Sequence, residues 1–92
     1  AVRAVALNRA IVLAQLQQVP SGIREIWNIE DINRLLSTHY MYSAVLGDMY
    51  LRLGDEHNSK KYLQAAHDLT TSLAEKKLIT DKMEKLAKMK LN

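Results

Sequence analysis

Residues that break helices are scarce in this chain, and that scarcity limits the folds open to it. Its 92 residues include one Pro and three Gly, whereas the helix-favouring residues Leu, Ala, Lys and Met are plentiful. A fold with many turns needs more of the residues that form turns. No stretch sustains a strict alternation of apolar and polar residues, so no sheet is expected. The sequence therefore predicts an all-α fold in a single domain.

Five helices are expected from the spacing of apolar residues, over about residues 2–18, 21–29, 39–53, 56–69 and 73–89, with one extra helical turn over 32–36. The residues at their ends are of the types that stop or cap helices. Val19 and Pro20 should end the first helix, and Ser21 should cap the second. Ser37 or Thr38 should cap the third helix, and Gly54 should end that helix. Asp55 should cap the fourth helix, and Thr70, Thr71 and Ser72 should end the fourth helix and cap the fifth. The first helix is apolar around much of its circumference, which predicts that it is heavily buried.

The segment 40–70 resembles a tetratricopeptide repeat. In that pattern Leu-Gly is followed three residues on by Tyr, as Leu46-Gly47 is followed here by Tyr50. The turn Gly54-Asp55, Ala66 and Leu69 fall in the same register. We expect Gly47 to let the partner helix approach closely, and Tyr50 to fill the gap between the paired helices. Ser43, Ser59 and Thr71 depart from the pattern, so a generic helical hairpin is the alternative.

A fainter copy of this repeat precedes it. Leu7-Asn8 followed by Ile11 mirrors Leu46-Gly47 followed by Tyr50 at an offset of 39 residues, which is longer than the roughly 34 of the plain repeat. The predicted architecture is a tetratricopeptide-like α–α superhelix. It comprises a degenerate repeat over 1–36, a better-formed repeat over 37–71 and a capping helix over 72–92.

Three phrases of the sequence are similar to one protein family. ALNRAIVLAQ (6–15), THYMYSAVLGDMYLRLGD (38–55) and AEKKLITDKMEKL (74–86) resemble the C-terminal helical extension of bacterial ECF-type RNA polymerase sigma factors. The resemblance implies a cytoplasmic parent protein that initiates transcription and touches DNA only through regions preceding this chain. The extension would support or regulate the sigma core through protein contacts. The chain starts at Ala1 inside a predicted helix, so we expect a fragment of a longer protein, one whose isolated form could dimerise.

The candidate protein-binding residues follow from the repeat analogy, in which the first helix of each repeat lines the concave face. They are Val5, Arg9, Val12, Ala44, Asp48, Leu51 and Arg52. Expected partners are the sigma core regions of the same chain, RNA polymerase or a regulator; a free-standing adaptor that binds a peptide is the alternative. A second interpretation places Asn8 against the second helix and pairs Arg9 with a nearby acid. Residues 39–42 suit either an interface or core packing.

The basic excess of the chain is confined to its end. Lys and Arg number 13 against 10 acids, and from Leu73 onward six Lys face three acids. Lys82, Lys85 and Lys88 could contact phosphates as an auxiliary nucleic-acid site, although a solvated helix face is the ordinary interpretation.

The sequence offers no pattern typical of an enzyme. It has no Cys, and its three His do not stand with carboxylates at metal-ligand spacing. It also lacks a Gly-rich phosphate loop and a marked nucleophile. We therefore expect no catalytic residue, cofactor or metal. The apolar runs fall far short of the roughly 20 residues of a membrane span, so no membrane partner is expected.

Overall fold

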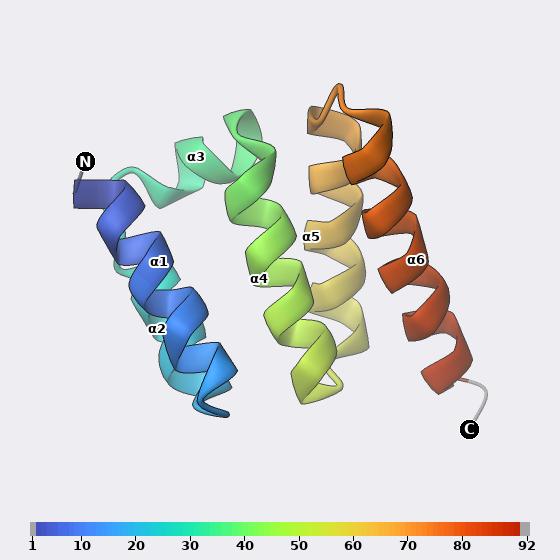
Figure 1. The fold of residues 1–92 in the computed structure, drawn as a ribbon, viewed down its shortest axis with the longest axis horizontal. Coiled ribbons are helices and arrows are strands. Elements are labelled where there is room, and N and C mark those ends of the chain that lie inside the picture. Colours follow the sequence, from blue (N-terminus) through green and yellow to red (C-terminus); the bar gives the residue numbers. More distant parts are fainter. Residues whose placement is uncertain (1, 91–92) are drawn as a thin grey trace.

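The computed structural model describes residues 2–90, which fold into helices joined by short turns (Figure 1). The helices are α1 (Val2–Gln15), α2 (Val19–Trp27), α3 (Ile32–Thr38), α4 (Tyr40–Leu53), α5 (Glu56–Leu69) and α6 (Leu73–Lys90). Within these described residues there is no strand, which confirms the predicted all-α class.

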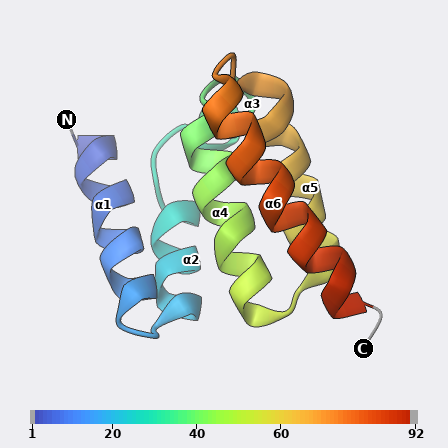
Figure 2. The same cartoon turned by 45° about the vertical axis from the view of Figure 1, so that its right-hand side comes forward.

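Two antiparallel hairpins and a final helix stand side by side (Figures 1 and 2). The first hairpin pairs α1 with α2, and the second pairs α4 with α5; α6 then packs along α5. Helices α1, α4 and α6 run in one direction, and α2 and α5 run in the other. The short helix α3 connects the hairpins and packs on α4 and α5.

The boundary between α1 and α2 differs from the prediction. Helix α1 ends at Gln15, and α2 already begins at Val19 with Pro20 in its first turn. Pro fits there because the first N–H groups of a helix have no partner within the helix. Gln17 reverses the chain in the left-handed region, at φ 63°. Ser21 therefore lies inside α2 and is not its cap.

Ser37 and Thr38 were also expected to cap a helix, and that prediction is wrong. Both belong to the last turn of α3, which is longer than the single turn expected. Their hydroxyls donate to the carbonyl of Arg34, at 3.0 Å from Ser37 and 2.7 Å from Thr38. His39 precedes α4 with extended backbone and gives no side-chain cap.

The turn between α4 and α5 has the predicted chemistry. Gly54 lies at φ 77°, and the N–H of Asp55 donates to the Tyr50 carbonyl at 2.9 Å, which closes the end of α4. The Asp55 carboxylate accepts from the backbone N–H of Asn58 at 3.1 Å and so caps α5. Ser72 caps α6 in the same way, accepting from Glu75 at 3.2 Å.

This cap makes the stability of the protein depend on pH. The side-chain amide of Asn58, and then its backbone N–H, hold the pKa of Asp55 below its ordinary value of 3.8. A carboxyl group whose pKa is lowered in the folded state stabilises the protein at pH values above its ordinary pKa. That contribution is lost as the pH falls through the folded-state pKa. Asp55→Asn keeps an acceptor that does not titrate. As the pH is lowered from about 5 to about 3, we expect the thermal midpoint of wild type to fall relative to that of Asp55→Asn. A constant gap across that range would contradict the assignment.

Two glycines allow the paired helices to approach closely. A Cβ on Gly47 would lie 2.8 Å from Leu63 Cγ and 2.9 Å from the Leu63 backbone nitrogen, so α5 passes directly over this position, as predicted. Gly22 has the same role in the first hairpin, where a Cβ would lie 2.8 Å from the Ala10 carbonyl oxygen. Gly22 is thus a packing residue inside α2.

Buried polar groups and aromatic rings complete the packing between helices. Ser59 donates to the Gly47 carbonyl at 2.9 Å, across the α4–α5 crossing. Tyr50 stacks on Tyr62 of α5 with ring centroids 5.9 Å apart, and its hydroxyl accepts from Trp27 Nε1 at 3.1 Å. Tyr50 therefore joins α2, α4 and α5. Burial raises the pKa of the Tyr62 hydroxyl above 10.0.

Helix α1 is less buried than its composition predicts. Its inner face, formed by Leu7, Ala10 and Ala14, packs in the core. Its outer face leaves Val5 and Val12 exposed at 56% and 52%, and Leu16, just after its end, is 63% exposed. The reason is position, because α1 forms one end of the row of helices and has neighbours on one side only.

Candidate functional site: a groove between α1, α4 and α6

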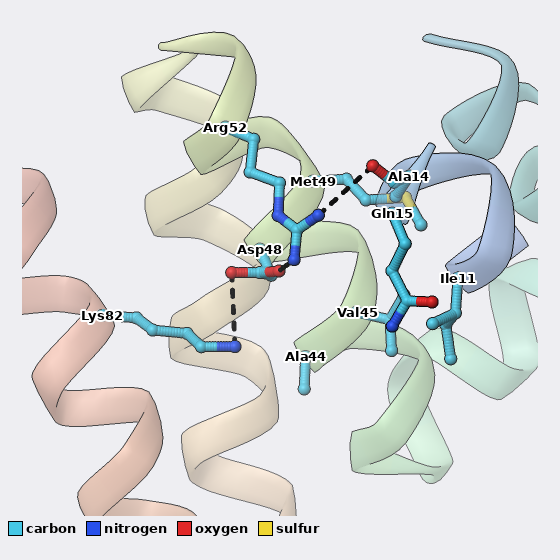
Figure 3. A pocket seen from close by; sticks show the side chains of 9 residues that line it. All are labelled: Ile11, Ala14, Gln15, Ala44, Val45, Asp48, Met49, Arg52 and Lys82. Carbon is cyan, nitrogen blue, oxygen red and sulfur yellow. Dashed lines mark hydrogen bonds and ion pairs between the residues drawn. The ribbon is translucent and has the colours of Figure 1, made fainter. Parts of the chain in front are cut away.

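A groove opens where three helices that run in the same direction meet (Figure 3). Its cavity has a volume of about 170 Å³. The lining residues are Ile11, Ala14 and Gln15 from α1, Ala44, Val45, Asp48, Met49 and Arg52 from α4, and Lys82 from α6. The groove therefore has walls from both hairpins and from the last helix.

The α4 wall follows from helical spacing. Ala44, Asp48 and Arg52 are four residues apart, and residues at that spacing lie above one another on one side of a helix. Core-facing residues of α4, such as Leu46, alternate with them and hold this side toward the groove. The sequence thus places one small and two charged residues in a row along the groove.

A cluster of three charges occupies the centre of the groove (Figure 3). Asp48 Oδ2 lies 3.1 Å from a guanidinium nitrogen of Arg52, and Asp48 Oδ1 lies 3.3 Å from Lys82 Nζ. The other terminal nitrogen of Arg52 donates to the Ala14 carbonyl at 3.4 Å, near the end of α1. The cluster therefore links α4 with α6 directly and with α1 through Arg52.

The structure brings three of the predicted concave-face residues together, namely Ala44, Asp48 and Arg52. Leu51 does not join them, because it is buried. Val5 and Val12 are on the exposed side of α1, away from its core face, and are not among the lining residues. The side of α1 that packs inward is formed by Leu7, Ala10 and Ala14 instead.

The pairing predicted for Arg9 is present, but the position predicted for Asn8 is wrong. Arg9 lies 3.6 Å from Glu25 of α2. Asn8 is exposed, and the close contact between α1 and α2 is made by Gly22 against the Ala10 backbone. Side chains 39–42 divide between both predicted roles, since Tyr40 and Tyr42 are half-buried whereas His39 and Met41 are exposed.

The three lysines proposed as phosphate contacts do not act as one row. Lys82 points into the groove and pairs with Asp48, whereas Lys85 and Lys88 are exposed. Residues three apart on a helix are offset by about 60° around its axis, so the three side chains spread over about 120°.

Sequence reasoning missed the α1 wall and the role of Lys82 in the groove. Ile11 and Gln15 are four residues apart, which marks a common side of α1, but the spacing does not say which side faces α4. The contact between Lys82 and Asp48 joins residues 34 positions apart, and no local signal predicts it.

A second hollow lies on the opposite layer, between α2, α3 and α5. Trp27, Leu36, Lys61 and Tyr62 are among its lining residues, and the Lys61 ammonium lies 5.3 Å from the centre of the Tyr62 ring. Among residues 2–90, no group of three or more His, Cys, Asp and Glu side chains is placed to hold a metal ion. In the same residues, no helix combines the length and apolarity needed to cross a membrane.

Comparisons with known proteins add no relative. No protein-family model matches the chain, and no match was found among curated proteins or among solved structures.

Proposed function

We propose that this chain is a non-catalytic protein-interaction domain that holds a segment of another protein in the groove between α1, α4 and α6. The observation that carries the proposal is the composition of this groove. Apolar side chains such as Ile11 and Val45 lie next to the partly exposed charges of Arg52 and Lys82. Protein interfaces combine a small apolar centre with polar groups at the rim in this way.

The size of the groove favours a protein side chain over a cofactor. Sites for cofactors and metabolites usually measure about 300–1,000 Å³. A cavity of about 170 Å³ is smaller than that. A closed apolar cavity of about 150 Å³ is enough for one benzene molecule. One large side chain therefore fits, and the open path between the helices leaves room for the backbone that carries it.

We further propose that the hairpins follow a tetratricopeptide-like plan. Three observations support this plan: the close approach at Gly47, the stacking of Tyr50 on Tyr62, and the common direction of α1, α4 and α6. On this plan the helices α1 and α4 are the first members of their repeats, and the groove lies on the concave side.

The parent protein that we propose is an ECF-type sigma factor, on the resemblance of segments 6–15, 38–55 and 74–86. The groove would then contact the sigma core regions of the same protein, RNA polymerase or a regulator in the cytoplasm, and other regions would read the promoter. The encoding reading frame tests this part directly. Sigma-type regions encoded in frame ahead of Ala1 are expected. A frame without them would leave a free-standing peptide-binding adaptor as the function.

Filling the groove should abolish the interaction. In the full-length sigma factor, Ala44→Trp is expected to lower transcription from its own promoter by about tenfold or more, because the indole occupies the space of the partner's side chain. The matched control is Ala65→Trp, another half-buried Ala, which lies in the hollow on the opposite layer. Reconstituted transcription measures both variants, and circular dichroism confirms their folding. Equal activity of the two folded variants would contradict the assignment of the groove.

A further inference from the structure

We propose that Asp48 occupies the place of a partner's carboxylate, and that the groove selects acidic segments which compete with Asp48 for Arg52 and Lys82. This inference rests on the proposed function, because it names the class of segment that the groove takes. It makes Asp48 a residue that sets affinity and specificity.

The charges of the groove are unequal. Arg52 and Lys82 supply two positive charges, and Asp48 is the one acid among the nine lining residues. The remaining lining side chains are apolar or uncharged, so the groove carries a net charge of +1 with Asp48 included. A segment with a carboxylate is therefore favoured over a neutral one, and a basic segment is disfavoured.

The two cations are reachable from solvent while Asp48 is more covered. The side chains of Arg52 and Lys82 are 47% and 40% exposed, against 21% for Asp48. A lysine has three donors and an arginine five. One contact to Asp48 from Lys82, and contacts to Asp48 and Ala14 from Arg52, leave donors available. An incoming carboxylate thus reaches solvent-exposed donors before it meets the more covered negative charge of Asp48.

Apolar residues near the charges indicate what the rest of the segment carries. Leu78 lies one helical turn before Lys82 on α6 and is 54% exposed. Met41 lies two turns before Asp48 on α4 and is 53% exposed. Ala44 stands between Met41 and Asp48, and α4 and α6 run in the same direction. A segment that carries an apolar side chain close to an acidic one matches this arrangement along the groove.

Asp48 could instead serve only to brace α4 against α6, and the two roles predict opposite results for Asp48→Asn. Loss of a brace would loosen the walls and weaken binding. Loss of a competitor would raise the charge of the groove from +1 to +2, free both cations and strengthen the binding of acids. Asn keeps the shape of the side chain, so the charge is the main change.

Fluorescence anisotropy with a labelled synthetic peptide that alternates Leu with Glu measures this difference. Wild type should bind the Glu peptide more tightly than its Gln counterpart, and the Gln peptide more tightly than its Lys counterpart. Asp48→Asn should bind the Glu peptide about fivefold more tightly, and Lys82→Gln and Arg52→Gln about fivefold more weakly each, which is the effect of one charge about 4 Å away in water. Lys60→Gln on α5, an exposed position outside the groove lining, removes the same charge and should change nothing.

Several outcomes would overturn the inference. The first is weaker or unchanged binding of the Glu peptide by folded Asp48→Asn. The second is equal affinity of wild type for the Glu and Gln peptides. If Ala44→Trp then abolishes the binding of both peptides, the acidic selectivity fails while the proposed function stands. If a single-stranded oligonucleotide displaces the labelled Glu peptide as well as unlabelled Glu peptide does, the groove is a nucleic-acid site instead. If no peptide of any charge binds, the proposed function itself fails. If Asp48→Asn does not fold, the preference of wild type and the losses in Lys82→Gln and Arg52→Gln decide the question.

Discussion

Gly47→Val is expected to lower the free energy of unfolding by about 3 kcal/mol, because the added side chain enters a helix crossing that has no room for it. The Cβ alone would lie 2.8 Å from Leu63 Cγ and 2.9 Å from the Leu63 backbone nitrogen. A side-chain atom can move aside, but the backbone nitrogen belongs to α5 and moves only with that helix. Helices α4 and α5 would have to separate.

Gly47→Ala tests the same contact against an opposing effect. Ala stabilises a helix interior by about 1 kcal/mol relative to Gly. Destabilisation by Gly47→Ala would therefore show that the contact with Leu63 outweighs helix propensity. Gly54→Ala is the control, since a Cβ there meets nothing within 4 Å and the cost comes from the positive φ alone, about 1–2 kcal/mol. Urea unfolding followed by circular dichroism measures all three variants. The packing account is wrong if Gly47→Val costs no more than Gly54→Ala.

Leu63→Ala should have a comparable effect for the opposite reason, because it leaves a cavity. Leu63 is fully buried with Ala66 and Ile79, where α4, α5 and α6 meet. Leu→Ala at buried sites costs about 2–5 kcal/mol, and we expect about 3 kcal/mol here. For a domain of this size that is a large part of the total stability. Urea unfolding measures the change.

The chain offers a matched control for this substitution. Leu73 is 82% exposed at the start of α6, and Leu73→Ala should change stability by less than about 0.5 kcal/mol. A second check is the combination of Gly47→Ala with Leu63→Ala. Removing the Leu63 side chain relieves part of the crowding, so the double variant should lose less stability than the sum of the single variants. Additive losses would mean that the two residues do not act on one contact.

The ends of the helices were predictable where a residue type has only one structural role at a helix end. Gly54 at positive φ and Asp55 as a cap depend only on their neighbours, and both predictions are confirmed. Pro20 was misassigned because proline both ends one helix and begins another. Thr38 was misassigned because a hydroxyl can donate to a carbonyl of its own helix as well as cap the next one.

The candidate site was predictable along one helix but not between helices. The spacing of Ala44, Asp48 and Arg52 places them on one side of α4, and they line one groove. The orientation of α1 depends on the contact of Gly22 with the Ala10 backbone, which is a tertiary contact without a signal in the periodicity. Val5, Arg9 and Val12, which the repeat analogy placed on the concave face, are therefore not among the residues that line the groove. The pairing of Lys82 with Asp48 arises only when α6 packs beside α4.

The central claim is that a protein segment binds between α1, α4 and α6. A titration of the labelled protein with the Leu–Glu peptide, followed by backbone amide shifts in NMR spectra, locates the bound segment residue by residue. The account predicts the largest shifts around Ile11, Ala44, Asp48 and Lys82, with little change at the indole N–H of Trp27 on the opposite layer. The largest shifts around Trp27 and Tyr62, with an unchanged groove, would contradict it.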